Sequence, residues 1–193
     1  MQNQNGQPQG QGLGIKGSFN VALAIANVHA MCITPFIRTG FGIEAFGPVA
    51  LASLVLMMVL GGLVPAPDMV PYVLFWMFAV LVQRGRSIKA ARKGVKGHSR
   101  YQGWPALAMR LVPSVQGEMK AKMLVEPMIC LVAGGLIWFV SPFVGKFVMC
   151  GFLSMAFTAD VNRQFWKARV RQMKDAQIEQ EQLIRMFNES DEF

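Results

Sequence analysis

The stretch AFGPVALASLVLMMVLGGLVPAP, residues 45–67, decides the fold class because it contains no charged side chain. Its centre, VALASLVLMMVL, would be apolar on every face of a helix, which is typical of a helix surrounded by lipid or protein. A helix over all 23 residues of this stretch would be about 34 Å long, and the hydrocarbon core of a bilayer is about 30 Å thick. The stretch therefore predicts a transmembrane helix.

A second apolar run follows directly along the chain. The segment VPAPDMVP, residues 64–71, holds three prolines, which disfavour helix and predict a turn with Asp68 at its tip. Residues 72–82, YVLFWMFAVLV, are apolar again. A helix from Met69 to Gln83 would be about 22 Å long, which is short for a full crossing. We expect residues 43–83 to form a first transmembrane hairpin.

The second half of the chain repeats this plan. Residues 126–140 and 147–157 are largely apolar and flank the break SPFVGK, which predicts a second transmembrane hairpin over residues 124–160. Gly-Gly-Leu occurs in both halves, at 61–63 and 134–136, where small residues would allow helices to pack closely in a membrane. A duplicated unit of hairpin plus basic segment explains this likeness, and so does the general similarity of hydrophobic hairpins.

Positive charge is concentrated after each predicted hairpin. The net charge is +8, yet residues 84–122 hold ten Lys or Arg and one acid, Glu118, and residues 163–174 hold five more bases and no acid. Cytoplasmic loops of membrane proteins carry such an excess. A topology with both termini in the cytoplasm places both basic regions on that side and the turns at Asp68 and Ser141 on the other. The charge therefore needs no nucleic acid to explain it, and nucleic acid is not an expected partner.

The remaining segments flank these hairpins. Residues 1–17 are rich in Gln and Gly, lack the pattern of a signal peptide, and predict a disordered tail. Residues 18–41 predict an amphipathic helix lying in the interface, with Asn20, Asn27 and Thr34 on one face, although a crossing helix stays open. Residues 84–123 form a basic cytoplasmic loop, and residues 161–193 predict a cytoplasmic helix that either folds back on this loop or binds a partner.

Few residues suggest chemistry. The two histidines, His29 and His98, and the three cysteines lack metal-ligand spacing, so we assign no catalytic, cofactor-binding or metal-binding residue and expect no cofactor. His98, Ser99 and Tyr101 beside Arg100 could bind a phosphate or a lipid headgroup, and His98 could activate a nucleophile. A solvated or interfacial turn explains these residues as well. Ionisable groups within spans are functional candidates. Three such groups lie at ends of the predicted spans, where we expect water nearby: Glu44, Glu126 and Asp160.

The fold class is thus an all-α integral membrane protein with four spans, and we expect a bacterial inner membrane. The first hypothesis for its function is a structural or assembly subunit, by analogy with conjugation and secretion machines. The alternatives are a small oligomeric transporter or channel component, and a lipid-active enzyme. Expected partners are anionic lipid headgroups, other proteins of a complex, and further copies of the chain. The residues expected to dock them are Arg84, Arg86, Lys89, Arg92, Lys93, Lys96, Arg100, Trp104, Trp166, Lys167, Arg169 and Arg171.

Overall fold

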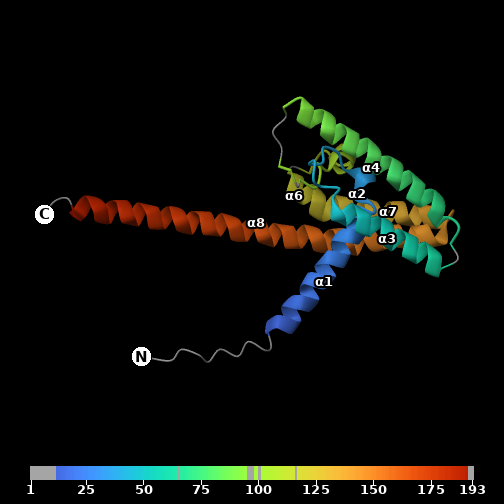
Figure 1. Ribbon diagram of the computed structural model, residues 1–193, viewed down its shortest axis with the longest axis horizontal. Helices are drawn as coiled ribbons and strands as arrows, with labels where there is room; N and C mark the ends of the chain where they lie inside the picture. The colour runs from blue at the N-terminus through green and yellow to red at the C-terminus, as the bar shows by residue number, and fades with distance from the viewer. Residues whose placement is uncertain (1–11, 65, 95–97, 100, 116, 191–193) are drawn as a thin grey trace. The chain divides into compact units, whose positions relative to one another are not determined.

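The computed structural model describes residues 12–64, 66–94, 98–99, 101–115 and 117–190. Over these residues the fold is all-helical, and its one extended pairing is an isolated bridge between Thr39 and Trp104 (Figure 1). The chain divides into two units, residues 1–158 and residues 159–193. The helices are α1 Gly12–Met31, α2 Thr34–Ile37, α3 Pro48–Leu63, α4 Met69–Arg92, α5 Ala106–Leu111, α6 Glu118–Lys120, a π-helical segment Ala121–Val125, α7 Glu126–Trp138 and α8 Pro142–Ser190.

The helix of the opening stretch is shorter than expected. α3 has 16 residues, which is about 24 Å of helix rather than about 34 Å. Pro48 lies in its first turn, where the missing N–H costs nothing. The helix ends at Leu63, and Val64 is already extended. α3 therefore ends before the turn that contains Asp68, and it is shorter than the span that the sequence predicted.

Two described helices are long and apolar enough to cross a membrane, namely residues 118–138 and the first part of α8 within residues 142–187. This result rests on length and composition and is weak evidence for a membrane protein. α3 counts only as a shorter apolar helix. The four spans are therefore not confirmed, because α3 is short and α4 passes from apolar to basic sequence within one helix.

The segment expected to lie in the interface contains a break. α1 ends at Met31, and α2 begins at Thr34 with Pro35 in its first turn. Thr34 is buried and belongs to a different helix from Asn20 and Asn27, so the polar face drawn through all three residues is wrong. Whether residues 18–41 lie in an interface stays a prediction.

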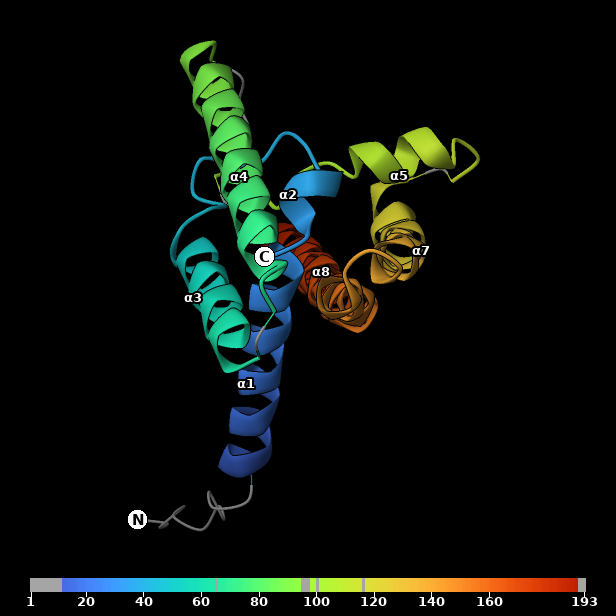
Figure 2. The same cartoon turned by 90° about the vertical axis from the view of Figure 1, so that its right-hand side faces the viewer.

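The break between α1 and α2 is covered by α4. Backbone carbonyls at a helix end need new partners when they are buried. Trp76 Nε1 donates to Met31 O at 3.0 Å, and Tyr72 Oη donates to Cys32 O at 3.0 Å. α4 packs against α2 and α3, and α1 packs against α3 (Figure 2). These hydrogen bonds thus connect α4 to the break between α1 and α2.

Both basic segments continue helices that start as apolar arms. α4 runs without interruption from Met69 to Arg92, and α8 runs from Pro142 to Ser190. We expected the boundaries at 83/84 and 160/161 to separate such parts, but no helix break occurs at either one. In the part of the chain that the structure describes, each long helix therefore continues from an apolar arm into a basic segment.

Two glycines allow α7 and the start of α8 to pack closely against each other. A Cβ added to Gly134 would lie 2.6 Å from Met149 N, and one added to Gly145 would lie 2.5 Å from Trp138 Cα. A Cβ on the neighbouring Gly135 would meet nothing within 4 Å. The expectation that Gly-Gly-Leu allows close packing is confirmed at Gly134.

Candidate functional site

The loop before α3 pairs with the centre of the basic loop. Thr39 and Trp104 exchange backbone hydrogen bonds of 3.0 and 2.6 Å. Gly42 N donates to Tyr101 O, and Glu44 N donates to Ser99 O, both at 2.9 Å. The segment around residue 101 is therefore held to the loop before α3 by backbone hydrogen bonds.

Two glycines permit this close approach. A Cβ on Gly42 would lie against the carbonyl oxygens of His98 and Ser99. Gly103 has a φ of +86°, which side chains other than glycine rarely adopt, and it packs against Arg38 and Phe41. The paired loops thus depend on glycine at both positions.

A buried ion pair lies beneath the paired loops. Arg38 follows α2, and Glu126 is the first residue of α7. Arg38 Nε lies 3.0 Å from both carboxylate oxygens of Glu126, and Arg38 Nη2 lies 2.5 Å from Glu126 Oε2. Arg38 is 6% exposed and Glu126 is 0% exposed. The expectation that Glu126 lies near water is therefore wrong.

The surrounding polar groups stabilise Arg38 in this position. Its Nη1 donates to Gln102 O at 3.3 Å, and its carbonyl oxygen accepts a hydrogen bond of 2.9 Å from Gln83 Nε2. Ser87 Oγ, one turn further along α4, donates to Phe41 O at 2.7 Å. A buried charge pair offsets its desolvation only when hydrogen bonds satisfy its remaining groups. This network fixes the loop that carries Arg38 to α4 as well as to α7.

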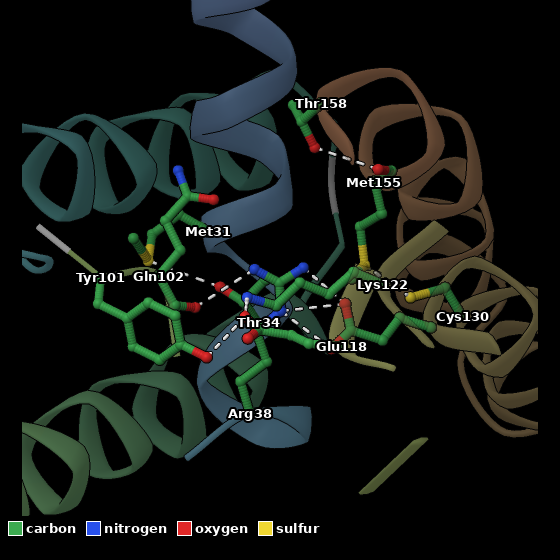
Figure 3. A network of polar contacts seen from close by, with 11 residues as sticks. Met31, Thr34, Arg38, Tyr101, Gln102, Glu118, Lys122, Cys130, Met155 and Thr158 are labelled. Carbon is green, nitrogen blue, oxygen red and sulfur yellow. Dashed lines mark hydrogen bonds and ion pairs between the residues drawn. The ribbon is translucent and has the colours of Figure 1, made fainter. Parts of the chain in front are cut away.

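A second charged group adjoins the pair (Figure 3). Glu118 Oε1 accepts hydrogen bonds of 2.6 Å from Tyr101 Oη and from Lys122 Nζ, and Lys122 Nζ lies 4.8 Å from the centre of the Tyr101 ring. Partial burial, followed by the hydrogen bond to Glu118, raises the pKa of the Tyr101 phenol. Tyr101 therefore stays protonated and donates to Glu118 at neutral pH.

The helix that carries these groups is irregular where they meet. The π-helical segment Ala121–Val125 directly precedes Glu126. Such insertions are rare and often occur at functional sites. Lys122 is four residues from both Glu118 and Glu126, and it pairs with Glu118, while Glu126 pairs with Arg38.

An open groove of about 970 Å³ lies beside the ion pair. Its polar lining includes Arg38, Glu44, Arg84 and Gln102, and the rest comes mainly from small and apolar residues of α1 and the start of α3. The structure thus brings Glu44 and Arg84, two residues singled out in the sequence, to one groove. It adds Arg38, which the sequence reasoning did not select.

The other residues selected from the sequence are not among those that line the groove. Asp160 accepts a hydrogen bond of 2.7 Å from Gln164 on its own helix. Lys96 and Arg100 fall outside the described residues. The remaining docking candidates are all exposed, on the last turns of α4, at the loop bridge or on α8: Arg86, Lys89, Arg92, Lys93, Trp104, Trp166, Lys167, Arg169 and Arg171. Their docking role stays a prediction.

The sequence does contain a feature that could have identified Arg38 as a site residue. It is the one Lys or Arg between Lys16 and Arg84, just as Glu126 is the one acid between Glu118 and Asp160. A base and an acid that each stand alone among residues without another charge of the same sign are candidates for pairing, since burying either one alone is costly. The contact between His29 Nδ1 and Ser154 Oγ, at 2.6 Å, was also missed, and nothing in the sequence connects residues so far apart.

The cysteines match their sequence interpretation in part. Cys32 and Cys130 are buried, as expected for small apolar residues, while Cys150 is exposed. Among the described residues, no group of three or more His, Cys, Asp or Glu could hold a metal ion.

The site is thus a buried charge pair in which each side-chain nitrogen of Arg38 and each carboxylate oxygen of Glu126 has a hydrogen-bond partner, with an adjoining groove. Such a pair can fix the relative position of helices, or it can exchange partners when a charged group enters. In comparisons with known proteins, the chain matches no family model, no curated protein and no solved structure. The function is therefore inferred from the fold and the site.

Proposed function

We propose that this protein is a multi-pass membrane subunit that anchors and assembles a protein complex. The observation that carries the proposal is the second unit, in which every side chain from 162 to 187 is exposed. Several of these side chains are large and apolar, including Trp166, Met173 and Ile184. Helices gain most of their stability from packing an apolar face, so we infer that a partner covers this one.

Exposed apolar stripes in the first unit support the placement in a membrane. Along the π-helical segment and α7, Leu124, Met128, Val132 and Leu136 recur every four residues and are all more than half exposed. α3 and α4 carry similar residues, for example Leu51 and Phe78. Large exposed apolar patches mark membrane or protein contacts. Lipid contact on all three helices would agree with two hairpins and a multi-pass topology.

The basic end of α4 supports a position next to a headgroup surface. Arg84, Arg86, Lys89 and Arg92 are all exposed, and exposed basic clusters next to a membrane attract anionic lipid at about 1 kcal/mol for each charge. The docking role of these residues follows from the proposal. A part in a conjugation or secretion apparatus of a bacterial inner membrane is the process that we favour, by fold-level analogy.

Photo-crosslinking in native membranes tests the assembly function. A photoreactive amino acid placed singly at Trp166, Val170, Met173 and Ile184 should yield discrete protein adducts, because the proposal buries these positions against a partner. The matched control positions are Arg171 and Gln182, which lie on other faces of the same helix and should give few adducts. If none of the four apolar positions forms a protein adduct while the chain accumulates in membranes, the assembly proposal is wrong.

Transport is the second candidate, and the buried ion pair favours it. Charged pairs inside membrane proteins mark ion and proton pathways, and the groove reaches Arg38. The two functions differ in what they require of Glu126. An assembly subunit needs only a stable packing at this position, whereas a transporter needs the charge itself, so a stable variant without either charge separates them.

A further inference from the structure

We infer that the groove beside the ion pair binds one glycerophospholipid, with the phosphodiester of the lipid at Arg38 and Arg84 and an acyl chain between α1 and α3. The inference rests on the proposed function, because it places the groove at the headgroup level of a membrane. The unused hydrogen-bond donors of Arg38, the charge of Arg84 and the apolar walls of the groove support it.

The guanidinium of Arg38 has donors that the ion pair does not use. A guanidinium has five N–H groups, all of them donors. Nε–H is shared between the two carboxylate oxygens of Glu126, one N–H of Nη2 donates to Glu126 Oε2, and one N–H of Nη1 donates to Gln102 O (Figure 3). In the described part of the chain, the second N–H of each Nη atom has no further acceptor. Arg38 lines the groove and Glu126 does not, so an anion in the groove would meet a buried cation with free donors.

Arg84 adds a positive charge to the same groove. Its side chain is exposed on α4 and belongs to the groove lining. Among the residues that the structure describes, no acid pairs with it. Arginine suits phosphate because its planar guanidinium donates from a fixed fork that matches the phosphate oxygens. The groove therefore offers two guanidiniums to one phosphate.

The start of α3 adds a weaker attraction for an anion. Gly47, Pro48 and Val49 line the groove, and no side chain of the described residues caps the first turn of α3. A helix N-terminus has a partial positive charge and N–H groups without helical partners, which favour an anion. The helix end thus reinforces the site that the two arginines form.

Glu44 limits the charge of the ligand. Its side chain lines the groove and already interacts with another group of the chain. A nearby carboxylate disfavours further negative charge. A phosphomonoester carries about 1.5–2 negative charges at neutral pH, whereas a phosphodiester carries only one. The groove therefore fits the phosphodiester of a lipid headgroup better than a phosphomonoester.

The remaining walls are apolar, which favours a lipid over a free phosphate. α1 contributes Ala24 and Val28, and α3 contributes Val49 and Ala52. Ser53 Oγ donates to Val28 O at 2.8 Å, which connects the two walls. A free phosphate would leave these walls in water, whereas an acyl chain would cover them.

The position of the groove along the chain agrees with the proposed topology. Arg84 lies where α4 passes from its apolar arm to its basic segment, and α3 begins at Pro48. In the proposed topology both positions are at the cytoplasmic end of the first hairpin. Lipid headgroups and basic residues meet at that level.

Native mass spectrometry of the full chain in mild detergent tests the inference, with phosphatidylglycerol as the probe. The protein should retain one lipid under conditions in which further lipids dissociate. Arg84→Gln should weaken this retention about five-fold, the effect of losing one basic contact of about 1 kcal/mol. The matched control Arg86→Gln, exposed on the same helix and outside the groove lining, should retain the lipid as the unaltered protein does.

Two further variants test the walls and the buried guanidinium. Ala24→Trp fills the groove and should abolish retention, whereas Ala22→Trp, at an exposed position of the same helix outside the groove lining, should not. Arg38→Met together with Glu126→Leu removes the guanidinium without leaving an unpaired buried charge. This double variant should also lose the lipid. If it does not fold, Arg84→Gln and Ala24→Trp still decide the result.

Inorganic phosphate distinguishes a lipid site from a site for a soluble anion. A large excess of phosphate should leave the lipid bound, because phosphate covers none of the apolar walls. Displacement of the lipid by phosphate would overturn the assignment to a lipid.

Equal retention by Arg84→Gln, Ala24→Trp and the unaltered protein would overturn the inference. If the chain is still inserted in membranes in that case, the proposed function stands. Recovery of the chain in the soluble fraction would overturn the lipid site and the membrane function together.

Discussion

Replacing Glu126 by leucine should destabilise the protein by about 3–5 kcal/mol, because it leaves the Arg38 guanidinium buried without its countercharge. Replacing Arg38 by methionine should cost a similar amount by leaving the carboxylate unpaired. Thermal unfolding of the protein purified in mild detergent, followed by size-exclusion chromatography, measures both losses.

The double variant Arg38→Met with Glu126→Leu serves as the control. Apolar replacement of a whole buried ion pair is often neutral or stabilising, so the double variant should recover most of the lost stability. A double variant as unstable as the two single changes combined would contradict the account of the pair as an isolated buried unit. If the double variant is stable and assembles normally but loses biological activity, transport rises above assembly as the function.

Adding one methyl group at Gly134 should destabilise the contact of α7 with α8 by about 1–3 kcal/mol, the usual cost of overpacking. The added Cβ of Gly134→Ala would lie 2.6 Å from Met149 N, and a helix backbone cannot move away without opening the contact. The same unfolding assay in detergent measures the loss.

Gly135→Ala is the matched control, because a Cβ there meets nothing within 4 Å. Alanine is favoured over glycine inside a helix by about 0.5–1 kcal/mol, so this neighbouring change should be neutral or stabilising. Equal effects of the two substitutions would contradict the close packing at Gly134.

The sequence predicted the classes of segment better than their lengths. Apolar runs and proline turns correctly indicated an all-helical fold and the breaks near Asp68 and Ser141. They did not reveal that α3 starts only at Pro48, because the residues before it, AFG, are as apolar as a helix interior. Composition also suggested that a basic loop begins at residue 84, whereas Gln83 and Arg84 continue α4.

The ion pair shows why the site was harder to predict than the fold. Glu126 was selected for its position at the end of an apolar run, which suggests contact with water. Its burial depends on Arg38, which lies 88 residues earlier, and on the pairing of the loop containing Gly42 with the loop containing Tyr101. Such long-range contacts arise from tertiary packing and leave only an isolated charge as a trace in the sequence.

The membrane topology is the central claim, and cysteine labelling in intact cells tests it most directly. Single cysteines at Asp68, Val140, Ser99 and Gln177 are exposed positions in a background without native cysteines, and Val140 stands in for the buried Ser141. A membrane-impermeant thiol reagent should label Asp68→Cys and Val140→Cys from outside. Ser99→Cys and Gln177→Cys should react only after the membrane is permeabilised. Labelling of Ser99→Cys in intact cells, or recovery of the chain in the soluble fraction, would contradict the account.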